Sequence, residues 1–204
     1  MESEPWGWTT ASLWMKGARD ALISDEVQRD ENLKSRLHSI DLNVVAACAE
    51  ELRGKMNSTR LPLVFAHNDL SNTNVHWDPD TNQARLLDFE YGGVNYRGFD
   101  LATHLSHWAG GALDGLYEDD LFPTEFEQQA FLAAYAKGVA GTSRQAPTIQ
   151  ELQQEIIMSR PLSNLVWGLW ALCMLPEALK RPASRFSHIE YAERRLQAFF
   201  KGME

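Results

Sequence analysis

Residues 61–74, LPLVFAHNDLSNTN, and residues 83–91, QARLLDFEY, decide the fold of this chain. The apolar run LPLVFA gives way at once to polar residues, which is typical of a buried strand that feeds a loop. The segment DPDTN at 78–82 is a dense turn signal between NVHW and QARLLDFE, so this part of the chain predicts a β-hairpin. The sequence indicates no other strand.

Helical patterns surround this central segment on both sides. Apolar residues recur at helical spacing over residues 9–23 and, more regularly, over 42–56. The charge-rich residues 24–41 between them fit either a short helix or a solvated connection, and periodicity does not decide between the two. After Asp100 the chain predicts helices to its end.

Prolines and capping residues divide the second half of the chain. Pro161 interrupts a long helical pattern that begins at 148, so we expect residues 161–175 to form a separate or kinked helix that is ended by Pro176. Three capping-box patterns mark helix starts in this half: Thr124 with Glu127, Thr148 with Glu151, and Ser187 with Glu190.

These patterns predict one α+β domain that is mostly α, with a small inserted β-hairpin. We expect helices within residues 9–58, the strand, loop and hairpin within 61–91, and a further helical part within 98–204. The 204 residues, 44% hydrophobic and 23% charged, are typical of a single globular domain.

The charge balance argues against nucleic acid as a partner. The chain has 19 Lys and Arg against 28 Asp and Glu, a net charge of −9, and no clustered basic stretch, whereas binding through counterion release needs clustered cations. Cys48 and Cys173 belong to no metal or disulfide motif, which favours a reducing compartment.

The sequence also bears on secretion and on membrane insertion. The first residues, MESEPWGWTT, lack the basic start and apolar stretch of a secretory signal. The longest apolar run has 11 residues, at 165–175, against the roughly 20 that span a bilayer. We therefore expect a cytoplasmic protein without a membrane span.

Three oxygen-bearing side chains are expected to converge at the hairpin. Asp69 follows the apolar strand, Asn74 lies where the loop enters the hairpin, and Asp88 ends the second strand of the hairpin. Carboxylate and amide oxygens suit Mg²⁺, which takes its other oxygens from water and phosphate. The sequence therefore predicts phosphoryl-transfer chemistry.

The order and spacing H-x-D-L-x-x-x-N, followed by D-F, are those of the kinase catalytic loop and metal-binding segment. In that mechanism Asp69 accepts the proton of the attacking hydroxyl, while Asn74 and Asp88 hold the metal. His67 is expected to orient the loop. A lone Asp or Asn in a loop is usually a cap or turn residue, so the interpretation depends on the joint spacing. The pattern departs in two places, with Asn68 for Arg and Glu90 for Gly.

Three segments resemble the choline/ethanolamine kinase family: HNDLSNTN at 67–74, LLDFEYGGVNYRGFDLATHLSHWAG at 86–110, and SNLVWGLWAL at 163–172. The first alone would also fit aminoglycoside phosphotransferases, and the other two are more specific. The resemblance implies the C-terminal lobe of a protein-kinase-like fold. It also implies a cytosolic enzyme that uses MgATP to phosphorylate ethanolamine or choline in phospholipid head-group synthesis, including that of phosphatidylethanolamine.

The resemblance carries over the roles of base and magnesium ligands given above, and it adds Tyr91, Trp167 and Trp170 as walls for the ammonium end of the substrate. Trp167 and Trp170 stand three positions apart and share a helix face. An indole face attracts an ammonium group by roughly 0.5 to 2 kcal/mol. The alternative is that both tryptophans are core residues.

One departure from the family bears on specificity. The family usually has an acidic residue where this chain has His107, so we expect a carboxylate near the ammonium to be missing. Ala109 and Gly110, which follow, favour ethanolamine over choline. His104 and His107 could also suggest a zinc pair, but zinc wants a third protein ligand and the chain has no HExxH pattern.

A second departure concerns the nucleotide. No Gly-rich loop, P-loop or strand-borne lysine precedes Asp69, where kinase-like folds place the N-terminal nucleotide lobe. We therefore expect that lobe to be absent and the chain alone to be weakly active or inactive. The alternatives are a non-catalytic C-lobe module that pairs with a full-length homologue, a homodimer, or another small-molecule phosphotransferase of the aminoglycoside type.

Overall fold

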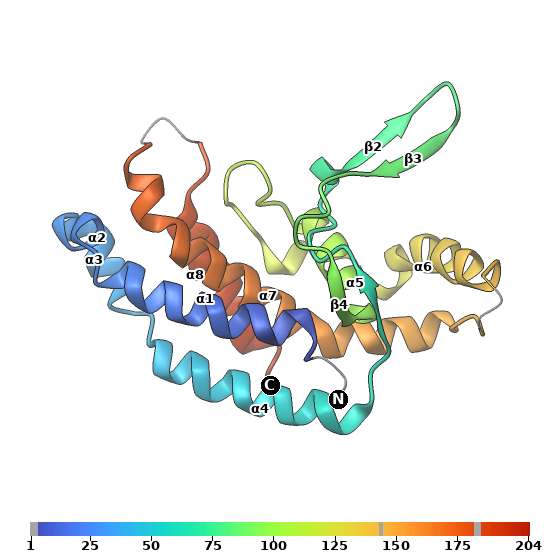
Figure 1. The fold of residues 1–204 in the computed structure, drawn as a ribbon, viewed down its shortest axis with the longest axis horizontal. Coiled ribbons are helices and arrows are strands. Elements are labelled where there is room, and N and C mark those ends of the chain that lie inside the picture. The colour runs from blue at the N-terminus through green and yellow to red at the C-terminus, as the bar shows by residue number, and fades with distance from the viewer. Residues whose placement is uncertain (1–3, 143–144, 182–184) are drawn as a thin grey trace.

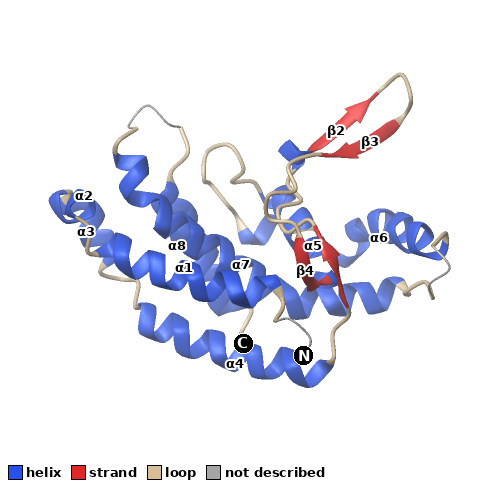
Figure 2. Ribbon diagram, in the orientation of Figure 1, coloured by secondary structure: helices blue, strands red, loops and turns tan. Residues whose placement is uncertain are grey.

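The computed structural model describes residues 4–142, 145–181 and 185–204. Helices dominate these residues, and two small antiparallel sheets lie in the middle of the chain (Figure 1, Figure 2). The helices are α1 (Trp6–Leu22), α2 (Asp25–Arg29), α3 (Glu31–Leu37), α4 (Leu42–Thr59), α5 (Arg97–Ser106), α6 (Glu125–Ala140), α7 (Ile149–Leu179) and α8 (His188–Lys201). The strands are β1 (Leu63–Ala66), β2 (Val75–Asp78), β3 (Gln83–Leu86) and β4 (Gly93–Tyr96). This is the mostly helical α+β fold that the sequence predicts.

Helix α7 is the centre of the fold. It packs mainly against α8, α1 and α5 (Figure 1), and Leu165, Leu169 and Leu172 on it are fully buried. Pro161 starts no separate helix, and the expected helix end at Pro176 is wrong, because α7 runs through both prolines. A proline inside a helix costs about 3 kcal/mol, and full burial of a leucine contributes about 1.5 to 3 kcal/mol, so packing outweighs the break.

The same helix is long and apolar enough to cross a membrane, judged by length and composition alone. In the fold, 61% of its most apolar window is buried inside the protein. Such burial is that of a core helix packed between α1, α5 and α8.

The undecided segment between the first two long helices forms α2 and α3. The Ser24 side chain accepts a hydrogen bond from the Val27 backbone N–H, and the Asp30 side chain caps α3 at Asn32 and Leu33. Val27 and Leu33 are buried in the main core. Capping and burial therefore make this segment helical, which the periodicity of its residues alone did not indicate.

The capping residues of the second half lie at the expected helix starts. Complete capping boxes join Thr124 with Glu127 at α6 and Thr148 with Glu151 at α7. At α8 the Ser187 side chain accepts from the backbone N–H of Glu190. These local signals need no tertiary contact, which is why the sequence alone predicts them.

The strands form two separate pairs. The predicted hairpin is confirmed as β2 and β3, with Val75 opposite Leu86 and Asp78 opposite Gln83, and it projects away from the helices (Figure 2). The predicted strand at 61–66 is confirmed as β1, but its partner β4 was not expected. Strand β4 is GVNY, four residues that begin on a glycine, and glycine weakens a strand pattern.

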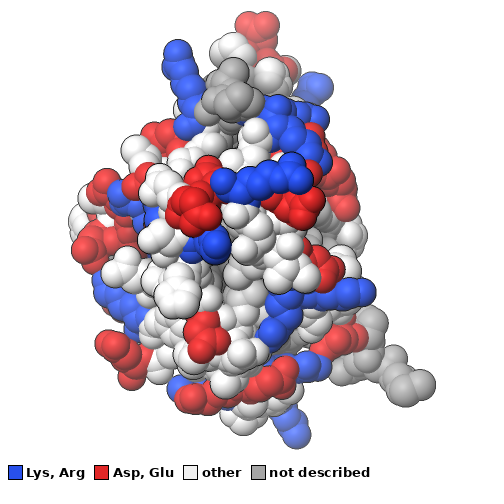
Figure 3. Space-filling model, turned by 90° about the vertical axis from the view of Figure 1, so that its left-hand side faces the viewer, with Lys and Arg blue, Asp and Glu red and all other residues white. Residues whose placement is uncertain are grey.

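Charged side chains are mixed over the surface. On the face shown in Figure 3, Lys and Arg alternate with Asp and Glu, and no broad area carries one sign of charge. Many of these charged side chains form ion pairs on the surface, such as Arg181 with Glu177 and Lys55 with Glu51. Exposed pairs of this kind contribute about 0 to 1 kcal/mol each, so the buried core, rather than surface charge, stabilises the fold.

Candidate active site

Residues 67–74 form a loop between β1 and β2, which we call the polar loop. The carboxylate of Asp100, on α5, accepts hydrogen bonds from the backbone N–H groups of His67 and Asn68, each at 2.8 Å. Asn68 has a left-handed backbone with φ of 68°, and its Nδ2 donates to the Tyr91 carbonyl at 2.8 Å. Asn95 Nδ2 donates to Asn68 Oδ1 at 2.8 Å. These bonds hold the start of the polar loop to α5 and β4.

Asp69 and Asn74 lie together at the two ends of this loop. Asn74 Nδ2 donates to the Asp69 backbone carbonyl at 2.9 Å and to Asp69 Oδ2 at 3.0 Å. Burial raises the pKa of the Asp69 carboxyl to about 6; the Asn74 hydrogen bond opposes this rise, and the nearby carboxylates of Asp88 and Glu90 add to it. Asp69 is therefore a carboxylate whose pKa lies close to neutral pH.

His67 connects the polar loop to the segment before Asp88. Its Nδ1 accepts from the Asp69 backbone N–H at 3.3 Å, so its Nε2 carries the proton and donates to the Leu87 carbonyl at 2.6 Å. The imidazole also packs on the Phe89 ring, with centroids 4.6 Å apart. The sequence-predicted residues 67, 69 and 88 are thus joined through the His67 side chain and the backbone.

Asp88 is exposed and has a left-handed backbone with φ of 60°. Within residues 4–142, 145–181 and 185–204, no Lys or Arg forms an ion pair with Asp69, Asp88 or Glu90. In that range no three His, Cys, Asp or Glu side chains converge to hold a metal by themselves. The oxygens of Asp69, Asn74 and Asp88 fit Mg²⁺, which takes few protein ligands and fills its other positions with water or phosphate oxygens.

A cavity of about 230 Å³ opens beside Asp69. We call it the aromatic cavity, and its lining includes Asp69, Glu90, Tyr91, His107, Trp167, Trp170, Phe186 and Tyr191. Tyr91 and Trp167 lie edge to face with ring centroids 5.9 Å apart, and Trp167 and Trp170 do so at 5.8 Å. All three aromatic residues singled out in the sequence therefore face one cavity.

The two tryptophans are not equivalent. Trp167 is 7% exposed and belongs to the main core, where it also contacts Trp14, while Trp170 is only partly buried. Trp167 Nε1 is buried and has no hydrogen-bond partner among the described residues. Trp167 is therefore both a core residue and a wall of the cavity, and its contact with an ammonium group stays a prediction.

Glu90 supplies a carboxylate at the aromatic cavity. Burial, and then the Glu90 charge, raise the pKa of the neighbouring Tyr91 hydroxyl, which places Glu90 close to the rings. We expected no carboxylate near the ammonium because His107 replaces the usual acidic residue of the family. The departure from the kinase pattern at position 90 puts an acidic group on the cavity wall instead.

His104 on α5 and His107 in the following turn have different surroundings. His104 Nδ1 is 3.1 Å from the Leu70 carbonyl, and its ring stacks on Phe131 at 4.8 Å. His107 lines the aromatic cavity, where burial, and then the charge of Arg195, lower its pKa to about 3. His104 therefore holds the polar loop, and His107 presents a neutral imidazole to the cavity.

Sequence reasoning missed three residues of this site. Asp100 stands in the first turn of α5, and an acidic residue there is an ordinary helix feature. Phe186 and Tyr191 belong to the far end of the chain and reach the cavity only because α8 packs on α7. No local pattern at 186 or 191 could have indicated that contact.

The chain is similar in sequence to a known family of proteins. The family described as Choline/ethanolamine kinase matches residues 1–200. "Probable ethanolamine kinase A" from Dictyostelium discoideum is 29% identical over 193 residues, covering 93% of this chain and 52% of its own length. "Choline kinase alpha" from Mus musculus is 26% identical over 209 residues, covering 92% of this chain and 45% of its own length.

A solved structure also shares the fold. The ethanolamine kinase of Plasmodium vivax superposes with a TM-score of 0.75 at 25% identity, covering 96% of this chain and 49% of that one. The chain thus spans about half the length of the curated relatives it matches.

Proposed function

The chain belongs to the choline/ethanolamine kinase family, and we propose that its aromatic cavity binds ethanolamine or choline, whose hydroxyl receives the γ-phosphoryl group of MgATP. The observation that carries this proposal is the position of the Asp69 carboxylate on the wall of a cavity that is also lined by several aromatic rings. An amino alcohol has a cationic end for the rings and a hydroxyl for the carboxylate, so one molecule satisfies both.

Asp69 is proposed as the catalytic base. Its pKa of about 6 leaves it ionised at neutral pH while keeping it basic enough to take a proton, which is the balance that general base catalysis requires. The hydrogen bond from Asn74 Nδ2 fixes Oδ2. The bond from His67 to the Leu87 carbonyl holds the loop beside the segment that carries Asp88.

Asn74 and Asp88 are proposed to hold magnesium. Bound Mg²⁺ would neutralise charge on the phosphate groups of ATP during transfer. The Asn74 side chain uses its Nδ2 atom for Asp69, so its Oδ1 remains available as a ligand. Asp88 is exposed and has no ion-pair partner among the described residues, which leaves its carboxylate open to a cation.

The ammonium end is proposed to lie against Tyr91, Trp167 and Trp170. Each aromatic face attracts a cation by roughly 0.5 to 2 kcal/mol. A primary ammonium also donates three hydrogen bonds, and Glu90 and the neutral imidazole of His107 offer acceptors at this cavity. These acceptors favour ethanolamine over choline, and the product would be a phosphorylated head group for phospholipid synthesis in the cytoplasm.

A second candidate function, pairing with a nucleotide-binding part, has one observation in its favour. Phe65 is 68% exposed and Val94 is 44% exposed, and they face each other in register on the β1–β4 sheet. The 204 residues also contain no Gly-rich phosphate loop. We propose that a nucleotide-binding part, carried by a longer form of this chain or by a full-length homologue, covers this sheet and that the chain alone turns over weakly or not at all. A homodimer would cover the sheet in a different way.

The experiment is a titration of the chain's tryptophan fluorescence with ethanolamine, choline and the aminoglycoside kanamycin, each against sodium chloride of equal ionic strength. We expect saturable binding of ethanolamine and choline because Trp167 and Trp170 line the cavity, and tighter binding of ethanolamine. Saturation by kanamycin alone would contradict the proposed substrate class. A coupled assay with MgATP should show little turnover, and rapid turnover would contradict the need for a further part.

A further inference from the structure

Helix α8 carries an arginine whose guanidinium is buried. Arg195 is 1% exposed and is the largest fully buried side chain in the described residues. Its Nη1 donates to Asn164 Oδ1 on α7 at 2.6 Å, and its Nη2 donates to the Tyr191 hydroxyl at 2.9 Å. Two arms of one planar group therefore join α7 to a residue of the aromatic cavity.

No carboxylate contacts this guanidinium in the part of the chain that the structure describes. Its Nε has no hydrogen-bond partner there, and its charge lies 4.2 Å from the centroid of the Tyr117 ring. The Tyr117 hydroxyl donates to Asp119 Oδ1 at 2.8 Å, so the balancing negative charge is one side chain further away. A buried cation held in this way costs stability, and an apolar side chain of similar size is often at least as stable.

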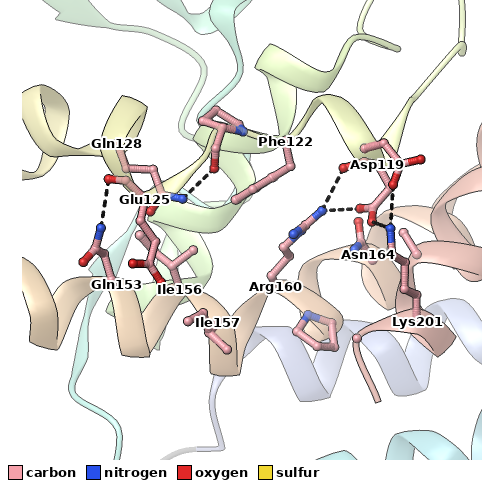
Figure 4. A pocket seen from close by; sticks show the side chains of 15 residues that line it. Asp119, Phe122, Glu125, Gln128, Gln153, Ile156, Ile157, Arg160, Asn164 and Lys201 are labelled. Atoms are coloured by element: carbon pink, nitrogen blue, oxygen red, sulfur yellow. Dashed lines mark hydrogen bonds and ion pairs between the residues drawn. The ribbon is translucent and has the colours of Figure 1, made fainter. Parts of the chain in front are cut away.

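The far side of this network lines a second cavity of about 490 Å³ (Figure 4). In Figure 4 the carboxylate of Asp119 lies between Arg160 and Lys201, and ion pairs join it to both. Asn164, which accepts from Arg195, lies on the same wall. Because Arg160 and Lys201 both pair with Asp119, neither cation of this cavity is free to select a ligand, and the two ion pairs hold Asp119 near the buried arginine.

The near side of the network is the Tyr191 ring. This ring packs edge to face with Trp170 at 6.4 Å and lies 5.3 Å from Phe186. Gly111 approaches it so closely that an added Cβ would lie 3.0 Å from the ring. The rings around Tyr191 limit where it lies, but among the described residues only Arg195 bonds to its hydroxyl.

We propose that Arg195 is a positioning residue of the aromatic cavity: by holding the Tyr191 hydroxyl and the Asn164 amide together, it fixes the Tyr191 ring as a wall and so sets the affinity for the ammonium group. The inference rests on the proposed function, since it assigns a purpose to a wall of that same site. Arginine suits the role because its rigid fork reaches two acceptors at once, whereas lysine offers a single point charge.

A consequence for the cavity follows from the same charge. Burial, and then the charge of Arg195, lower the pKa of the neighbouring His107 so that it stays neutral, and no second cation develops on the wall that faces the substrate. The positive charge of Arg195 itself is separated from the cavity by the Tyr191 side chain. Its place beneath the wall therefore leaves aromatic faces and a neutral imidazole, rather than a second cation, on this side of the cavity.

The test measures the Kd of choline and ethanolamine, by tryptophan fluorescence, for Arg195→Met, Arg195→Lys, Tyr191→Phe and the double variant Arg195→Met with Tyr191→Phe. We expect Arg195→Met and Tyr191→Phe each to raise both Kd values roughly tenfold. The double variant should bind no more weakly than Arg195→Met alone, because both changes break the same bond. Arg195→Lys should restore part of the affinity.

Arg194→Met is the matched control, since Arg194 is the next residue on α8 and forms partly exposed ion pairs with Glu190 and Glu118. Its Kd values should equal those of the wild type. Unchanged Kd values in Tyr191→Phe and Arg195→Lys would overturn the proposal, whatever their melting temperatures. If Arg195→Met does not fold, those two variants still decide the result.

A wild-type chain that binds neither amine would contradict the proposed function separately. In that case near-ultraviolet circular dichroism decides whether Arg195 positions the ring. The same change of the aromatic bands in Tyr191→Phe and Arg195→Met, absent in Arg194→Met, would support positioning. Bands identical to those of the wild type in Arg195→Met and Arg195→Lys would overturn it.

Discussion

The carboxylate of Asp69 shows how a single residue acquires its chemistry from its surroundings. An aspartate in an exposed loop has a pKa near 3.9, whereas burial raises that of Asp69 to about 6. The nearby carboxylates of Asp88 and Glu90 act in the same direction. The site is therefore built around a charge that the fold disfavours and that a bound cation would stabilise.

The first prediction concerns Asp69→Asn. Because the folded-state pKa lies above the ordinary value, the contribution of Asp69 to stability is fully present below about pH 4 and is lost as pH rises through about 6. Asparagine carries no charge, so Asp69→Asn should be more stable than the wild type at pH 8 by about 2 to 3 kcal/mol, and the difference should vanish near pH 4. Urea unfolding at the two pH values measures this.

Asp80→Asn, at the exposed hairpin turn, is the control and should leave the pH dependence unchanged. In an enzyme completed with its nucleotide-binding part, Asp69→Asn should also lower kcat by orders of magnitude. If the free energies of unfolding of the wild type and of Asp69→Asn change equally between the two pH values, burial of the Asp69 charge does not lower stability.

The second prediction concerns Trp170→Leu. Leucine keeps much of the apolar contact but removes the aromatic face, so we expect the Kd for choline to rise severalfold, as a loss of roughly 0.5 to 2 kcal/mol implies. Calorimetric titration measures the change. Trp108→Leu is the control because Trp108 is 63% exposed and does not line the cavity. Equal affinities in both variants would assign Trp170 to packing alone.

At the scale of elements, the close packing of α7 on α8 brings the two sides of the aromatic cavity together. Gly168 stands between Trp167 and Trp170 and faces α8. A Cβ there would lie 3.0 Å from Leu196 Cγ and 3.3 Å from Arg195 Cβ. The glycine in WGLW thus permits the approach that places Tyr191 opposite the tryptophans.

The third prediction follows from that contact. Gly168→Ala should lower the free energy of unfolding by about 1 to 3 kcal/mol, since α8 must shift to admit the methyl group. Gly138→Ala is the matched control: Gly138 is also helical but has nothing within 4 Å of an added Cβ. It should raise stability by about 0.5 to 1 kcal/mol. Thermal unfolding distinguishes the two, and equal effects would contradict the close packing.

Elements also show which sequence signals are sufficient. The capping boxes of α6 and α7 and the turn of the hairpin are local patterns, and each lies where the sequence predicts it. The continuity of α7 through Pro161 and the pairing of β4 with β1 depend on burial and on partners distant in the chain. Local patterns could not indicate either one.

For the whole molecule, the notable feature is an uneven surface. The helical body buries its apolar residues in two cores, while the β1–β4 sheet leaves Phe65 and Val94 exposed at its outer face. Large exposed apolar patches mark interaction surfaces, and these two side chains are the basis for the proposal that a further part covers the sheet. The chain also spans about half the length of its relatives, which is consistent with a covering part.

The fourth prediction belongs to this surface. The double variant Phe65→Lys with Val94→Lys should reduce self-association of the chain at high concentration, measured by sedimentation velocity, with little change in melting temperature. Phe126→Lys is the control, because Phe126 is 79% exposed but lies on α6, away from the sheet. If the control variant reduces association equally, general solubility rather than this sheet is responsible.

The sequence by itself determined the helix starts, the hairpin, and the spacing of His67, Asp69, Asn74 and Asp88. These depend on backbone geometry and on hydrogen bonds between residues close in the chain. Only the tertiary structure decided that Pro161 lies inside one helix, that Asp100 anchors the polar loop, and that Tyr191, bonded to Arg195, lines the aromatic cavity. Those features arise from burial and from contacts between distant segments, and their free energies exceed the local preferences that a sequence pattern reports.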